Sequence, residues 1–312
     1  MDQSSAMAEH IMEASGLTLH FSPAQIFLGL AMLTIILLSN GKSLLFMWHV
    51  RLVLQLSRHL LFRRRSLTIS SASHGAESLF LPVLTSSYTP LLDVDYNLHK
   101  SNSTFFNDLD DNRTELMLAL FKNVMAPQKQ GKSTLKPKTI NLGGTACIFK
   151  KPIAPFARYE ISSRVLCWDQ KWIYVVSHFT KPGANKPTAF VLGSQTPSSQ
   201  MARVVGKADE ASEEGVYASA IAKYVFKAGR VTVAPEEVIA ECGLFPEKTF
   251  TQQGGRAERG GLKPREVSQG HWSWERVQEE CRRNLPLAQN FANLDQLHGT
   301  RFGGSGPALY AY

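Results

Sequence analysis

The chain has 312 residues, 44% of them hydrophobic and 19% charged, so a hydrophobic core of ordinary size can form. Its four cysteines are widely spaced without a CxxC pair, which argues against a zinc site or a disulfide framework; we expect no metal and no cofactor. The net charge of +8 is concentrated between residues 127 and 171, where nine Lys or Arg stand against two acidic residues. This stretch either meets a phosphate-bearing partner or is a solvated loop. Because no RNP, KH or zinc-finger pattern accompanies it, we do not expect nucleic acid as the partner.

An uncharged segment stands near the N-terminus. Residues 14–41 contain no Asp, Glu, Lys or Arg, and residues 26–38 (IFLGLAMLTIILL) are almost all aliphatic. Because about 20 mostly apolar residues span a bilayer, we expect a transmembrane helix over 22–41, preceded by a polar N-terminus over 1–21. The residues before it are acidic and no small-residue cleavage site follows closely, so we expect an uncleaved anchor.

A basic segment follows over residues 42–65. Arg51, Gln55 and Arg58 recur at helical spacing among apolar residues. The pattern favours a helix in the membrane interface with its arginines toward anionic head groups, the alternative being a buried helix. By the positive-inside rule everything after residue 42 is then cytosolic, and we favour the endoplasmic reticulum as the organelle.

We expect a tether over 66–80 and one folded domain over 81–249. A long helix is predicted over 102–124, where apolar residues recur mostly at four-residue steps and polar side chains at its start can cap it. This helix carries two glycosylation sequons, at Asn102 and Asn112. A glycan on a core helix would prevent folding, so we interpret both as accidental and as support for a cytosolic domain.

Beyond a loop over 126–141 the pattern changes to a period of two. It predicts strands at 145–150, 159–168, 172–180, 217–226 and, more weakly, 186–193, with a disordered insert over 194–214 and a short helix over 234–242. The order of strand, long helix and several antiparallel strands predicts an α+β fold in which one helix packs on a curved sheet. After it we expect a linker over 250–271, a helical appendage over 272–297 broken at Pro286, and a flexible tail over 298–312.

Residues 92–113 (LDVDYNLHKSNSTFFNDLDDNR) carry a motif that indicates chemistry. They resemble the signature D-x-D-x-x-G-H-V-N-N-x-x-Y-L-x-x-F-E-x-A-R of hotdog proteins of the 4-hydroxybenzoyl-CoA thioesterase type. Leu98 replaces the glycine, and Lys100-Ser101 replaces Val-Asn. These departures, together with residues 164–178 and 217–242, resemble a subgroup that also has an N-terminal membrane segment: thioesterase superfamily member six and its fungal relatives. The matching residues are Asp93, Asp95, His99, Asn102, Phe105, Asp110 and Arg113.

The resemblance implies a hotdog fold, a homodimer, and hydrolysis of acyl-CoA near a membrane surface. It assigns Asp95 as nucleophile or base, with His99 and Asn102 beside it. Free backbone N–H groups at the start of the long helix would polarise the thioester carbonyl. We expect Asp110, Lys150 and Lys151 to contact the substrate, the lysines through the phosphates of coenzyme A.

Each of these residues also has a plainer interpretation. Asp93 and Asp95 suit turns or caps, His99 a hydrogen bond across the helix start, Asn102 a helix cap, and Asp110 an ion pair with Arg113. The alternative function is a hotdog protein that binds acyl chains or partner proteins without turnover. Leu98 favours that alternative because its side chain would narrow the approach to backbone where the signature has glycine, and the C-terminal appendage favours it too.

Overall fold

The computed structural model describes residues 22–62, 65–126, 128–130, 133–185, 191, 215–246 and 271–300. Several predicted segments therefore fall outside the described residues: the polar N-terminus, the insert over 194–214, the linker up to residue 270, the tail from residue 301, and the weak strand at 186–193 apart from residue 191.

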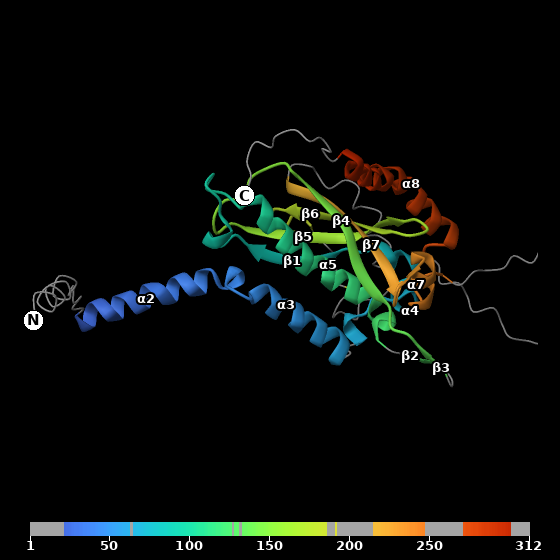
Figure 1. Ribbon diagram of the computed structural model, residues 1–312, viewed down its shortest axis with the longest axis horizontal. Helices are drawn as coiled ribbons and strands as arrows, with labels where there is room; N and C mark the ends of the chain where they lie inside the picture. Colours follow the sequence, from blue (N-terminus) through green and yellow to red (C-terminus); the bar gives the residue numbers. More distant parts are fainter. Residues whose placement is uncertain are drawn as a thin grey trace, which may run out of the picture.

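The centre of the molecule is an antiparallel sheet with the strand order β1-β5-β6-β7-β4, in which β8 pairs with β7 (Figure 1). The α+β prediction with an antiparallel sheet is thereby confirmed. A separate two-stranded sheet joins β2 to β3. The strands are β1 Val83–Tyr88, β2 Gln128–Gln130, β3 Ser133–Leu135, β4 Thr139–Phe149, β5 Arg158–Trp168, β6 Ile173–Thr180, β7 Val216–Ala228 and β8 Val231–Val233.

The strand predicted at 145–150 begins earlier than expected, because β4 starts at Thr139. The pairing of β4 with β7 shifts register between Leu142 and Gly144, and this irregularity interrupts the period of two on which the prediction depended. Gly143 lies against Trp172, so closely that a Cβ atom there would come within 2.3 Å of the indole ring. Only glycine fits this approach, and a Gly-Gly pair is a poor signal for a strand.

Helix α5 (Asn102–Met125) lies along one face of the sheet and forms the core with it (Figure 1). It agrees with the helix predicted over 102–124. The ring of Phe105 lies 4.7 Å from that of Phe179 on β6, and the ring of Phe121 lies 5.0 Å from that of Phe226 on β7. Burying an aromatic side chain of this kind contributes about 1.5–3 kcal/mol. The contacts fix both ends of α5 relative to the sheet.

The opposite face of the sheet is covered by α8 (Trp274–Ala292) and by the 3-10 segment η9 (Asn293–Thr300). Side chains alternate across β7, so that Phe226 faces α5 whereas Lys223 faces the other way. There Lys223 Nζ lies 2.6 Å from Asp295 Oδ1. The predicted appendage is therefore a packed layer. It continues through Pro286 without the predicted break, because its packing against the sheet offsets the hydrogen bond that proline lacks.

Residues 66–80, predicted as a tether, instead pack into the core. Ile69, Leu79 and Phe80 are buried, because their apolar side chains cover the end of the sheet. The remaining helical segments of the described residues are short. The short segments are η1 Gly41–Ser43, the π-helical η2 Ser57–Leu61, η3 Arg65–Leu67, α4 Ser71–His74, η4 Ala76–Phe80, η5 Leu91–Asp93 and α7 Pro235–Glu241.

Helix α2 (Pro23–Ser39) projects from the rest of the chain, and none of its residues is buried (Figure 1). Ser22 caps it by accepting a hydrogen bond from Gln25 N–H, and Asn40 ends it. The helix has 17 residues and is shorter than the transmembrane helix predicted over 22–41. Within the described residues, no helix has both the length and the apolar character that crossing a bilayer requires.

Helix α3 (Met47–Leu56) lies along α5, which corrects the prediction that its polar face meets lipid head groups. Arg51 Nε lies 2.6 Å from Asp111 Oδ2, and Gln55 Nε2 donates to the backbone oxygen of Asp111 at 3.1 Å. Of the two arginines of this pattern that were predicted to face lipid head groups, only Arg58 is exposed. Acidic side chains on α5 attract the basic residues of α3. The spacing of those basic residues alone does not show whether their partner is an acidic helix or an anionic membrane, which is why the prediction was wrong.

Candidate active site

The motif residues lie on a tight hairpin that leads into α5. Val94 and Lys100 form an isolated antiparallel bridge, and Ser101 N–H donates to the backbone oxygen of Asp93 at 2.7 Å. Inside the hairpin Leu98 N–H donates to the backbone oxygen of Asp95 at 3.0 Å. Leu98 takes the left-handed conformation with φ +59°. Glycine adopts this conformation freely, which explains why the related signature has glycine at this point.

Asp95 and His99 come together on the open side of this hairpin. Asp95 Oδ1 lies 3.7 Å from His99 Nδ1, and the two side chains are 21% and 33% exposed. Asp95 Oδ1 also accepts a hydrogen bond from Asn97 N–H at 2.9 Å. Among the described residues, no lysine or arginine pairs with Asp95. The carboxylate is therefore held by its own loop and remains accessible to a substrate.

Asn102 is the first residue of α5 rather than its cap, which corrects that interpretation. The N-cap residue is Ser101, and its side chain makes no capping hydrogen bond. The Asn102 side chain is exposed at the helix start. Backbone N–H groups at an uncapped helix start, where the helix dipole is positive, form a natural site for an anion or a developing oxyanion.

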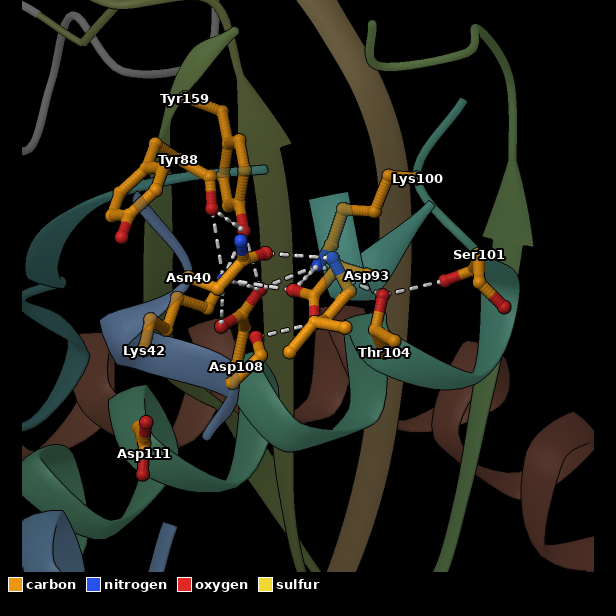
Figure 2. Close-up of polar contacts among 12 residues, drawn as sticks. Asn40, Lys42, Tyr88, Asp93, Lys100, Ser101, Thr104, Asp108, Asp111 and Tyr159 are labelled. Carbon is orange, nitrogen blue, oxygen red and sulfur yellow. Dashed lines mark hydrogen bonds and ion pairs between the residues drawn. The ribbon is translucent and has the colours of Figure 1, made fainter. Parts of the chain in front are cut away.

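A second group of charges lies on the buried side of the same hairpin (Figure 2). It comprises Lys42, Asp93, Lys100, Asp108 and Tyr159, here named the buried charge cluster. Figure 2 shows Lys42 and Lys100 converging on the carboxylates of Asp93 and Asp108. Lys42 Nζ lies 3.3 Å from Asp93 and 2.8 Å from Asp108, and Lys100 Nζ lies 3.2 Å and 2.9 Å from the same two residues. Two positive and two negative charges therefore balance.

Burial and pairing oppose each other inside this cluster. Burial lowers the pKa of Lys100 although both carboxylates oppose the shift. Burial alone would raise the pKa of Asp108, but the charges of Lys100 and Lys42, with hydrogen bonds from Lys42 and Tyr159, together hold it below its ordinary value. Burial and the neighbouring Asp108 carboxylate raise the pKa of Tyr159. The Tyr159 hydroxyl therefore stays protonated and donates a hydrogen bond to Asp108. The charges are stable only as a set.

Asp110 forms the ion pair that was the alternative to a substrate contact. Its Oδ1 accepts from Arg113 Nη2 at 2.9 Å, and the buried Arg113 also donates to Thr145 Oγ1 at 2.9 Å. Arg113 and Leu56 line a small cavity of about 110 Å³ between α3, α5 and β4. A role for Asp110 in binding substrate stays a prediction.

Lys150 and Lys151 directly follow β4, on a loop that is hydrogen-bonded to the hairpin. Both side chains are exposed, and both backbone N–H groups donate to Tyr217 O. Two residues later, Ile153 O accepts from Lys100 N–H at 2.8 Å. Lys138, in the same basic stretch, instead binds Glu241 beyond the far end of α5. The lysine pair at the end of β4 is therefore the better placed of the two.

The resemblance pointed to Asp95 and His99 but not to the partners of Asp93. Lys42, Asp108 and Tyr159 were missed because they stand far apart in sequence: Lys42 is 66 residues from Asp108 and 117 from Tyr159. A signal existed only for Lys42, which is the first charged residue after the uncharged segment. Among the described residues, no three His, Cys, Asp or Glu side chains gather as they would around a metal ion.

Comparisons with known proteins identify the family. A family model described as the thioesterase-like superfamily matches residues 89–235. The probable thioesterase atnL of Emericella nidulans is 37% identical over 284 residues, covering 86% of this chain and 87% of its own. The thioesterase poxG of Penicillium oxalicum is 36% identical over 274 residues, covering 85% and 84%. A solved structure, the probable thioesterase YbaW of Escherichia coli, aligns with 52% of this chain and 97% of its own at 12% identity and a TM-score of 0.35.

The antiparallel sheet packed on one long helix is the hotdog fold of thioesterases. The chain belongs to the thioesterase-like superfamily.

Proposed function

We propose that this protein hydrolyses acyl-CoA thioesters to the free acid and coenzyme A, with Asp95 as the reacting carboxylate. The observation that carries the proposal is the accessible Asp95–His99 pair on the loop that leads into the uncapped start of α5. A carboxylate and unpaired backbone N–H groups are thereby joined by one short loop. Thioester hydrolysis needs both, one to attack or activate water and the other to hold the oxyanion.

Two routes through Asp95 remain open. As a base, the carboxylate takes a proton from water while the water oxygen attacks the thioester carbon. The C–S bond of the tetrahedral intermediate then breaks, and coenzyme A leaves as the thiol after its sulfur takes the proton back from Asp95. As a nucleophile, it attacks that carbon itself, the thiolate of coenzyme A leaves, and water then hydrolyses the acyl-enzyme anhydride. In both routes the carbonyl oxygen becomes an oxyanion, and N–H groups at the helix start stabilise it. His99 orients the carboxylate, and Asn102 is placed to contact the substrate.

The coenzyme A end of the substrate is proposed to lie over Lys150 and Lys151. Their ammonium groups complement phosphate oxygens, and the hydrogen bond from Lys100 N–H to Ile153 O joins their loop to the hairpin of Asp95. We further propose that Asp110 borders the acyl group.

The test is hydrolysis of short-chain, long-chain and aromatic acyl-CoA by the full chain in detergent, measured as free thiol released. Asp95→Asn is expected to lower kcat about 10²–10³-fold, the usual cost of losing one reacting or oxyanion-stabilising group. Glu279→Gln, which removes an exposed carboxylate on α8, is the matched control and should keep the wild-type rate. A folded Asp95→Asn protein with the wild-type rate would refute the assignment.

A second candidate function is acyl binding without turnover, and Leu98 favours it. Its side chain is 75% exposed beside the backbone that would hold the oxyanion. Acyl-CoA binding by a folded wild type that releases no thiol, with the affinity unchanged in Asp95→Asn, would select this function.

We also propose that the protein is a homodimer. Strand β4 is at the edge of the sheet, and in the described residues no strand pairs with its outer side. Its apolar side chains Leu142, Ile148 and Phe149 are exposed, and edges of this kind invite pairing with a second chain. Light scattering coupled to gel filtration tests this; a monomeric mass at micromolar concentration would refute it.

We propose, finally, that α2 attaches the protein to a membrane, with the endoplasmic reticulum favoured and the folded domain in the cytosol, as in the type six subgroup. The support is a helix without charged residues whose side chains are exposed. The sequon at Asn102 tests the topology, because Asn102 is exposed whereas Asn112 is buried and donates to Thr85 Oγ1. A glycan on Asn102 in cells would refute the cytosolic placement.

A further inference from the structure

The segment that follows α2 is bound to the hairpin of Asp95 by a set of polar contacts. Asn40 Oδ1 accepts from Leu92 N–H at 2.9 Å, and Ser43 Oγ donates to Asp93 Oδ1 at 2.6 Å. Tyr88 Oη donates to the backbone oxygen of Ser39 at 3.2 Å. Residues 39–43 therefore run beside residues 88–93, immediately before the reacting carboxylate (Figure 2).

Lys42 makes the central contact of this segment. Besides Asp93 and Asp108, its ammonium group donates to the backbone oxygen of Tyr88 at 3.0 Å and to Tyr159 Oη at 2.8 Å. The side chain is almost wholly buried. An ammonium group held by four oxygen-bearing partners away from water has one favourable position, so the partners are fixed relative to one another.

The contacts of Asp93 transmit this order to the hairpin. Its carboxylate accepts from Lys100 Nζ, and its backbone oxygen accepts from Ser101 N–H, so Asp93 binds both the residue before α5 and the far strand of the hairpin. Asp95 is two residues away on the near strand. Without Lys42, two buried carboxylates would share one ammonium group, leaving a net charge of −1 that the interior cannot hold in this geometry.

We propose that Lys42 is a positioning residue for the Asp95 loop, so that the N-terminal segment beyond α2 is a working part of the active site. This rests on the proposed thioesterase function. Lys42 does not touch the substrate; it sets the distance and angle between the Asp95 carboxylate and the start of α5. A displacement of about 1 Å in such a geometry can cost about 10²-fold in rate.

The experiment compares three variants of the full chain in detergent. Lys42→Met removes the ammonium group, and Lys42→Met with Asp108→Asn restores the charge balance without restoring the contacts to Tyr88 and Asp93. Lys223→Met is the control, because it removes the ammonium group of another buried lysine, one that binds Asp295 on the opposite face of the sheet and away from the hairpin.

We expect Lys42→Met to lower kcat about tenfold or more with KM changed less than about threefold, since positioning acts on the reacting geometry. The double variant should recover part of the loss and stay at least about threefold below wild type. Lys223→Met should keep kcat within about twofold. A wild-type kcat in either Lys42 variant, or an equal loss in Lys223→Met, overturns the proposal. If Lys42→Met does not fold, the charge-balanced double variant decides alone.

Hydrogen exchange separates this inference from the proposed activity. Lys42→Met, or the double variant, should speed exchange of the amides of residues 94–101 relative to Lys223→Met, whether or not the protein hydrolyses acyl-CoA. Absence of turnover in the wild type with faster exchange in the variant would refute the proposed function and retain the loop-positioning role. Unchanged exchange over 94–101 would refute the positioning role.

Discussion

The two aspartates of the D-x-D motif, Asp93 and Asp95, are two residues apart and lie in opposite environments. Asp93 is buried against Lys42 and Lys100, in a cluster whose charges sum to zero. Asp95 is partly exposed, and its described contacts are to Asn97 N–H and His99. The first carboxylate is saturated with partners, whereas the second keeps acceptor capacity for a water molecule or a thioester.

This difference explains how one short loop supports both stability and chemistry. A carboxylate fixed by two ammonium groups cannot reorganise during a reaction, and it holds the backbone on which the second carboxylate stands. The reacting group can then be accessible without being mobile, which is the arrangement that preorganised catalysis requires.

The buried side should dominate stability. Asp108→Asn leaves Lys42 and Lys100 sharing only Asp93, and breaking a buried charge set in this way costs about 3–5 kcal/mol of the free energy of unfolding. Asp95→Asn removes a partly exposed carboxylate, and it should cost less than about 1 kcal/mol. Urea unfolding of the full chain in detergent, followed by far-UV circular dichroism, measures both values. Equal losses in the two variants would remove the distinction between the two sides.

The loss of stability at low pH should also come from the buried charge cluster. The pKa of Asp108 is lowered in the folded chain, so the unfolded chain binds more protons over the acid range and the stability falls with falling pH. The contribution of the ionised Asp108 carboxylate to the free energy of unfolding is fully present above its unfolded pKa of about 3.9. It is lost as the pH falls through the lower pKa of the folded chain. Asp95→Asn should retain the wild-type loss of stability below about pH 4, because it leaves the cluster intact. A variant lacking that acid dependence would show that Asp95, not the cluster, is responsible.

Most of the sheet and helix α5 followed from local pattern. Burial alternates over residues 159–165 and 217–222, and the four-residue steps of α5 face one surface, so these periods report burial directly. Local pattern failed where a segment needed a distant partner to explain it. The sequence of helix α3 has the same spacing whether Arg51 binds Asp111 or a lipid phosphate. In residues 66–80, small polar residues outnumber the apolar side chains that are buried, such as Ile69, Leu79 and Phe80, so the composition indicated a tether.

The site was predictable to the extent that it lies in one stretch of sequence. Asp95, His99 and the start of α5 fall within eight residues, so a motif could locate them. The cluster around Asp93 draws on η1, the hairpin, α5 and β5, and no spacing rule joins residues that only the tertiary fold brings together. The interpretation of Asn102 as the helix cap was wrong by one residue, because the N-cap is Ser101; an error of one residue is usual at a helix end.

The smallest effect is expected at Leu98, where the exposed side of the hairpin departs from the family signature. A left-handed conformation costs a residue with a side chain about 1–2 kcal/mol, part of which the greater unfolded-state freedom of glycine offsets. Because Leu98 buries little surface, Leu98→Gly should stabilise the fold by up to about 1 kcal/mol, raising Tm by roughly 2–4 °C. Differential scanning calorimetry of the full chain measures the shift.

Phe156 provides the matched control, because it has the same φ of +59° and is also exposed. Phe156→Gly should give a similar gain in stability, since the relieved backbone strain is the same. Only Leu98→Gly should also raise the rate of thiol release from acyl-CoA, because Leu98 lies in the hairpin of Asp95 whereas Phe156 does not. A gain in rate from both variants would point to general loosening of the loops, and a loss of stability in both would show that neither side chain is strained. A rate increase confined to Leu98→Gly would mean that this side chain limits access to the start of α5, on the side of the hairpin that Lys42 does not reach.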